Sequence, residues 1–97
     1  SDASSLTSTL LADCPPSRRR DIYRVTIKSG SVRKSSAHPE GTVEHAFVCS
    51  GKVRIGPDDN LKDLNEGDYF RFPGDVEHSY EALTDNSIYI LIMESPV

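Results

Sequence analysis

The feature that most constrains the fold is a series of short β-favouring segments, each closed within a few residues by a turn signal. The segments are rich in β-branched and aromatic residues and end at groups such as Ser29-Gly30-Ser31. No window shows a helical hydrophobic period with caps. Short strands at regular spacing indicate a sandwich or a closed barrel. The expected strands are residues 8–11, 22–27, 43–49, 52–55, 61–64, 68–72, 78–83 and 87–93.

The length of the chain allows one such unit, because 97 residues suffice for one domain and not for two. We expect a single all-β domain over residues 1–97, with a barrel from about residue 6 to 94 and with residues 1–5 disordered or left from a tag. A domain this small buries a modest share of its surface, so closure or association would stabilise it. Residues 88–93 are apolar on both faces, and we therefore expect a homodimer.

Charge and cysteine content exclude several classes of function. The formal net charge is −4 at pH 7, so direct nucleic-acid contact by this segment is not expected, because phosphate binding needs a basic face. No apolar run approaches the ~20 residues of a membrane span, and residues 1–5 lack the features of a signal peptide. Cys14 and Cys49 have no CxxC spacing and are interpreted as reduced thiols. Together these features predict a cytoplasmic protein without membrane contact.

The parity of residues 38–48 predicts a polar patch on one side of a strand. Alternate side chains of a strand face opposite sides, so His45 points away from Glu44. That face becomes polar toward its N-terminal end, which is typical of a site at the mouth of a packed interior. The face that includes Glu44 would carry His38, Glu40, Thr42, Glu44, Ala46 and Val48.

Two segments stand out for the spacing of their His, Glu, Gly and Pro residues. Residues 38–51 contain His38, Glu44 and Gly51, and residues 67–78 contain Gly67, Pro73 and His78. These spacings resemble the two motifs of the cupin superfamily. The sequence departs from them at Glu40, which stands at the position of a second His, and at Asp75, where the second motif usually has Gly. The resemblance implies a small cupin β-barrel, which is a double-stranded β-helix or jelly roll.

The same resemblance implies a metal site formed by His38, Glu40, Glu44 and His78. Imidazoles and carboxylates that converge from separate strands suit Zn, Fe, Mn or Ni, with positions left open for solvent. A carboxylate at position 40 can replace an imidazole and would favour harder ions. Two alternatives stay open. The Glu and His side chains can form a hydrogen-bonded pair without an ion, and the pocket can be filled by an organic ligand or by side chains.

A longer string of matches narrows the resemblance. From about residue 8 to residue 93, the sequence is similar to the C-terminal cupin sensor domain of XRE-type helix-turn-helix transcription regulators. This implies a module that binds a small-molecule effector and reports it to an N-terminal DNA-binding domain in the full-length protein. The matching residues are His38, Gly41, Glu44, His45, Gly51, Leu64, Gly67, Asp68, Phe72, Asp75, His78 and Tyr80.

Two further side chains are candidates for contacting the effector. Tyr80 shares the face of His78, so its hydroxyl could reach a ligand, and packing in the core is the other interpretation. Arg24 would bind a carboxylate effector if it pointed inward, and a surface position is the alternative. Two other functions are weighed against the sensor: a small metal-dependent enzyme of the isomerase or dioxygenase type, and a cupin without a ligand. We favour the sensor over the enzyme.

Overall fold

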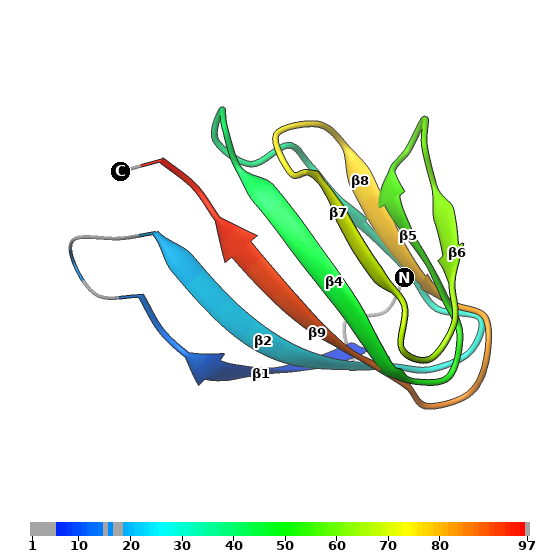
Figure 1. Cartoon of the computed structure of the whole chain (residues 1–97). Coiled ribbons are helices and arrows are strands. Elements are labelled where there is room, and N and C mark those ends of the chain that lie inside the picture. The colour runs from blue at the N-terminus through cyan, green and yellow to red at the C-terminus, as the bar shows by residue number, and fades with distance from the viewer. Residues whose placement is uncertain (1–5, 15, 17–18, 97) are drawn as a thin grey trace.

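The computed structural model describes residues 6–14, 16 and 19–96, and it confirms the predicted all-β fold. In this part of the chain the strands form two antiparallel sheets that pack against each other as a jelly-roll sandwich (Figure 1). One sheet has the order β1-β2-β9-β4-β7 and the other β3-β8-β5-β6. The strands are β1 (Leu6–Ala12), β2 (Arg20–Ile27), β3 (Val32–Ser35), β4 (Val43–Ser50), β5 (Val53–Pro57), β6 (Lys62–Leu64), β7 (Tyr69–Pro73), β8 (His78–Ala82) and β9 (Ser87–Glu94).

Two expectations about strands are corrected. Strand β3 was not predicted, because Arg33, Lys34 and Ser35 carry no apolar alternation. The strand predicted over residues 43–49 is confirmed as β4, but the side-chain alternation does not extend back to residue 38 as predicted, because residues 39–41 form a turn that the Thr42 amide closes onto the Pro39 carbonyl at 3.1 Å. The expectation for residues 1–5 lies outside the described part of the chain.

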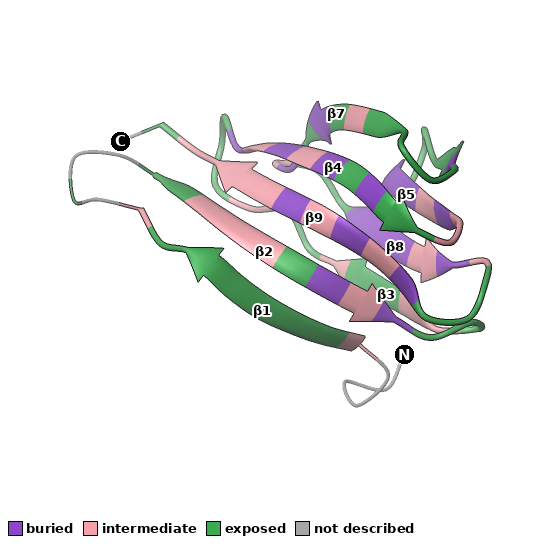
Figure 2. Cartoon of the chain, turned by 60° about the horizontal axis from the view of Figure 1, so that its bottom comes forward, coloured by how far each residue is buried: buried purple, intermediate pink, exposed green. Residues whose placement is uncertain are grey.

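Side-chain alternation places the core between the two sheets, as the burial pattern in Figure 2 shows. In β4 the side chains of Glu44, Ala46 and Val48 are buried between the sheets, while Phe47 faces outward and is exposed. Burying one large apolar side chain contributes about 1.5–3 kcal/mol. The alternation predicted for residues 43–48 is therefore confirmed, and it points Glu44 into the core.

The last strand, β9, lies at the centre of the five-stranded sheet. Its residues Tyr89 and Leu91 face the core, whereas the intervening Ile88, Ile90 and Ile92 are only half-buried on the outer face of the sheet. No helix in the described part of the chain is long and apolar enough to cross a membrane.

Candidate functional site

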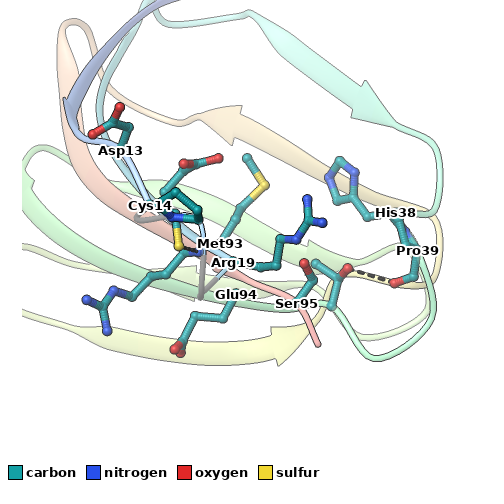
Figure 3. A pocket seen from close by; sticks show the side chains of 12 residues that line it. Asp13, Cys14, Arg19, His38, Pro39, Met93, Glu94 and Ser95 are labelled. Carbon is teal, nitrogen blue, oxygen red and sulfur yellow. Dashed lines mark hydrogen bonds between the residues drawn. The ribbon is translucent and has the colours of Figure 1, made fainter. Parts of the chain in front are cut away.

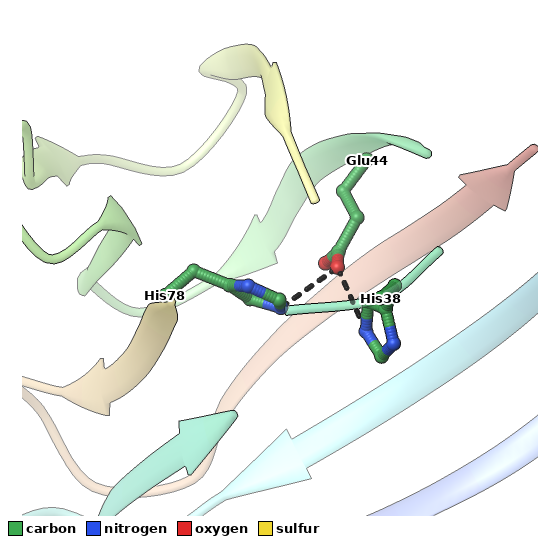
Figure 4. A group of neighbouring side chains, drawn as sticks. All are labelled: His38, Glu44 and His78. Atoms are coloured by element: carbon green, nitrogen blue, oxygen red, sulfur yellow. Dashed lines mark ion pairs between the residues drawn. The ribbon is translucent and has the colours of Figure 1, made fainter. Parts of the chain in front are cut away.

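Three side chains from separate parts of the chain converge at one end of the sandwich (Figure 4). Glu44 comes from β4, His78 is the first residue of β8, and His38 lies in the connection before β4. Glu44 and His78 are fully buried, and the His38 side chain is 33% exposed. Glu44 Oε2 lies 2.8 Å from His78 Nε2 and 3.3 Å from His38 Nε2. One ligand atom from each residue lies within 4.8 Å of the others.

The tautomer of His78 is set by its other ring nitrogen. Nδ1 lies 2.7 Å from the Val76 carbonyl oxygen, which can only accept a hydrogen bond, so Nδ1 carries a proton. In the neutral ring, Nε2 therefore presents a lone pair to Glu44 Oε2, which also has only lone pairs to offer. Neither of these buried atoms makes an aligned hydrogen bond to the described residues. Two facing lone pairs in a dry site require a cation between them, either a proton or a metal ion.

The electrostatics of His78 agree with this requirement. Burial opposes its protonation, but the Glu44 carboxylate and the Val76 carbonyl outweigh that cost and raise the pKa of His78 above its ordinary value. The hydrogen bond from Nδ1 to a backbone carbonyl is the outer contact that metal-bound histidines usually make. Three ligand atoms this close need at most a small inward movement of the half-exposed His38 to reach ~2.1 Å from one ion. The residues therefore fit a divalent metal.

The second oxygen of Glu44 is held by Tyr80, whose hydroxyl donates a hydrogen bond to Oε1. Burial and the Glu44 carboxylate raise the pKa of Tyr80, so the phenol keeps its proton and acts as a donor. Tyr80 is stacked on Tyr89, with ring centroids 6.0 Å apart. Space for the carboxylate depends on Gly74, where an added Cβ would lie 2.9 Å from Glu44 Oε2.

Backbone hydrogen bonds hold His38 beside this pair. The His38 amide donates to the Gly74 carbonyl at 2.9 Å, and the Gly74 amide donates to the Thr42 carbonyl at 2.8 Å. The Gly41 amide donates to Asp75 Oδ2 at 2.8 Å. Asp75, which departs from the motif, thus fixes the turn that carries His38. Sequence analysis did not assign Gly74 or Asp75 this role, because a contact between two loops leaves no periodic signal.

Glu40 is not brought to the cluster. It is exposed in the turn between Pro39 and Gly41, where strand parity does not apply, so the parity interpretation is wrong at this position. His45 lies on the outer face of β4, as expected, where its ring nitrogens contact Tyr69 Oη at 2.6 Å and Glu94 Oε1 at 2.7 Å. Within the described part of the chain, the group of His and carboxylate residues close enough to hold one ion is therefore His38, Glu44 and His78.

A pocket of about 260 Å³, here called the barrel pocket, opens beside this cluster. Tyr80 lines it, but Arg24 does not: its neighbours Tyr23 and Val25 face the pocket, and Arg24 is exposed on the opposite side of β2. The arginine in the lining is Arg33. The full lining is Leu6, Ser8, Tyr23, Val25, Arg33, Ser35, His38, Tyr80, Tyr89, Leu91 and Met93.

Arg33 was not predicted as a pocket residue because its strand, β3, was not predicted. The length of the unassigned segment could have indicated a further strand. The predicted strands left residues 28–42 without structure, and a connection of that length is unusual in a compact domain. His38 also lines a larger hollow of about 560 Å³. In Figure 3, His38 and Cys14 lie on opposite sides of this hollow. His38 therefore lies where the two cavities meet.

We predict that the Tyr80 hydroxyl stabilises the buried carboxylate. Tyr80→Phe leaves Glu44 Oε1 without its donor and should lower the free energy of unfolding by about 1–3 kcal/mol. Tyr89→Phe removes the same group from a neighbouring ring that does not hydrogen-bond Glu44, and should cost less. Urea denaturation with a chelator present measures both, and equal losses would contradict the assignment.

Comparisons with known proteins agree with this geometry. The family model for the cupin domain matches residues 23–94. The HTH-type transcriptional regulator SutR of Escherichia coli (strain K12) is 33% identical over 67 residues, which cover 69% of this chain and 38% of that protein. The oxalate decarboxylase OxdC of Bacillus subtilis (strain 168) is 26% identical over 87 residues, covering 84% of this chain and 22% of that protein. The chain thus spans well under half the length of both relatives.

A solved structure extends the comparison to nearly the whole chain. The crystal structure of an HTH_3 family transcriptional regulator from Vibrio cholerae matches with a TM-score of 0.90 at 24% identity, covering 96% of this chain and 52% of that one. This likeness shows the fold, and the match to the family model runs from β2 to the end of β9. The expected resemblance to the cupin domains of helix-turn-helix regulators is confirmed, and the chain belongs to the cupin family.

Proposed function

We propose that this chain is the effector-binding domain of a bacterial transcription regulator, which binds a small molecule in the barrel pocket beside a divalent metal ion. The observation that carries the proposal is the buried pair of His78 Nε2 and Glu44 Oε2, which face each other at 2.8 Å without a donor between them. Similarity to SutR, a transcriptional regulator, supports the regulatory context.

In this proposal His38, Glu44 and His78 hold the metal. Two imidazoles and one carboxylate are a ligand set of iron sites with open positions, and they also suit Zn, Mn or Ni. A bound ion would supply a Lewis-acidic contact for an oxygen or nitrogen atom of the effector. The protein fixes the position of the ligands: Tyr80 and Gly74 hold the carboxylate in place, and Val76 orients the His78 ring. Glu40 would join this set only if its turn moved inward.

The position of β1 suggests how occupancy of the pocket is reported. Leu6 and Ser8 of β1 line the barrel pocket, and β1 is an edge strand paired only with β2 in the described sheet. An N-terminal DNA-binding domain would be joined to the chain on the side of this strand. An effector that contacts β1 can therefore change how such a domain is held, with no nucleic-acid contact from the acidic domain itself. The setting we propose is the cytoplasm.

We also propose that the domain forms a homodimer through the outer face of the five-stranded sheet. That face carries Phe47, which is 45% exposed, together with the half-buried Ile88, Ile90 and Ile92. Cyclic dimers are the commonest assemblies, and a second copy would cover these side chains. Light scattering should give twice the chain mass of 10.7 kDa, and a mass of one chain would contradict this.

A metal-dependent enzyme is the second candidate, favoured by the similarity to an oxalate decarboxylase. Such chemistry needs a general base beside the open metal positions. The barrel pocket has no carboxylate among its lining residues, and Tyr80 is held protonated. These features support binding over catalysis. The discriminating measurement is release of carbon dioxide from oxalate by the metal-loaded chain, with no turnover expected from a binding domain.

We predict that metal binding depends on the three clustered residues and not on Glu40. His38→Ala and His78→Ala should each weaken Zn²⁺ binding by more than about 10–100-fold, the loss typical of removing even an outer contact. Glu40→Ala and the outward-facing His45→Ala serve as controls and should bind like the wild type. Calorimetry and metal analysis measure the affinity and the stoichiometry.

His38→Ala is the more informative of the two variants, because its side chain is partly exposed and its loss leaves no sealed cavity. Unchanged stoichiometry in both variants, with the fold intact by circular dichroism, would rule out this ligand set. Loss of Zn²⁺ binding in Glu40→Ala alone would show that Glu40 is a metal ligand, as the sequence predicted.

The regulatory context is tested by the coding sequence upstream of residue 1. We expect a helix-turn-helix domain in the same reading frame, because the chain spans 38% of the length of SutR. A start codon a few residues upstream of Ser1, with no helix-turn-helix domain in frame, would contradict the regulator proposal and leave the metal site to be judged separately.

A further inference from the structure

We propose that the barrel pocket recognises a small carboxylate and that Arg33 is the side chain that binds it. This inference rests on the proposed function of the barrel pocket as an effector site and adds the chemical class of the effector. It concerns a residue that lies outside the metal-ligand cluster.

The backbone register places Arg33 beside the floor of the pocket. On β3, Arg33 is directly opposite Tyr80 of β8, so the two side chains lie on the same face of the four-stranded sheet. Both line the barrel pocket.

The charge of Arg33 is available to a ligand. Among the described residues its guanidinium forms no ion pair. Arg54 of the same sheet differs, because it contacts Asp63 at 2.7 Å and Glu81 at 3.7 Å. An unpaired guanidinium at the wall of a pocket is suited to a carboxylate, which it can bind through two parallel hydrogen bonds. The chain is acidic overall, so an anion would enter only where a local cation attracts it.

The other residues that line the pocket indicate the chemistry of the rest of the ligand. Three tyrosine rings and several apolar side chains surround the pocket, and its serine hydroxyls offer further polar contacts. A volume of about 260 Å³ lies near the lower end of the range for ligand pockets, about 300–1,000 Å³, so the ligand is small. Benzoate, with one carboxylate on one ring, has a suitable size and chemistry to serve as a probe. Its amide, benzamide, has nearly the same shape without the charge.

The experiment titrates benzoate and benzamide into the ¹⁵N-labelled chain and follows the spectrum by NMR. We expect benzoate to bind saturably and to shift the Arg33 Nε–Hε signal and the amides near Tyr80. Benzamide should bind at least tenfold more weakly. Arg33→Gln should weaken benzoate binding at least tenfold, and Arg33→Lys should give an intermediate loss because lysine lacks the planar fork.

Two variants test whether the effect belongs to Arg33 or to positive charge in general. Lys34→Gln changes the next residue of β3, whose side chain faces the other way and pairs with Asp58. Arg24→Gln changes the arginine that was named as a candidate from the sequence and that faces away from the pocket. Both should bind benzoate like the wild type. The inference is overturned if benzoate does not bind saturably, if benzamide binds equally well, or if Arg33→Gln binds as tightly as Arg24→Gln.

Failure of this inference can be told apart from failure of the proposed metal site. Each titration is run on chelator-treated and on Zn²⁺-loaded protein, and the metal content of Arg33→Gln is measured. We expect that content to equal the wild-type value, because Arg33 is not in the ligand cluster. A chain that binds benzoate through Arg33 but takes up no metal would refute only the metal site. A chain that takes up metal but shows no effect of Arg33→Gln would refute only the carboxylate inference.

Discussion

The buried carboxylate of Glu44 is the group on which the rest of the structure depends. A fully buried charge is costly unless it is paired and hydrogen-bonded. Glu44 belongs to the five-stranded sheet, whereas His78 and Tyr80, which contact its two oxygens, belong to the four-stranded sheet. The interaction that compensates the charge therefore also joins the two sheets. One functional group is thus both part of the core and the centre of the candidate site.

The loops at this end of the sandwich are organised around the same carboxylate. Gly74 leaves space for it, and the backbone of Gly74 holds the segment that carries His38. Val76, two residues later, orients the His78 ring through its carbonyl oxygen. The connection between β7 and β8 therefore positions all three members of the cluster. The site is thus built by two strands and two loops, and backbone hydrogen bonds join the loop of Gly74 to the loop of His38.

The parts of this site that could be predicted from the sequence are those that follow side-chain alternation or the spacing of a known motif. Alternation along β4 placed Glu44 inside and His45 outside, and the motif spacing brought His38 and His78 to the same site. The same alternation misplaced Glu40, because a turn interrupts the strand before Val43. The pocket arginine was missed because β3 is an edge strand of polar residues, which pairs through its backbone and leaves no apolar pattern. Gly41 and Asp75 are both among the residues that match the regulator cupin domains, but nothing in that match predicts that the two are in contact, because a contact between loops follows no periodic pattern.

The most direct test of this account is the position of a metal ion in crystals of the chain grown with Zn²⁺. Anomalous diffraction should locate one ion about 2.0–2.2 Å from His38 Nε2, Glu44 Oε2 and His78 Nε2. His78 Nδ1 should keep its hydrogen bond to the Val76 carbonyl. An ion that instead occupies exposed groups such as Glu40, with the cluster empty at saturating Zn²⁺, would show that a proton alone separates the facing lone pairs. That result would contradict the central claim.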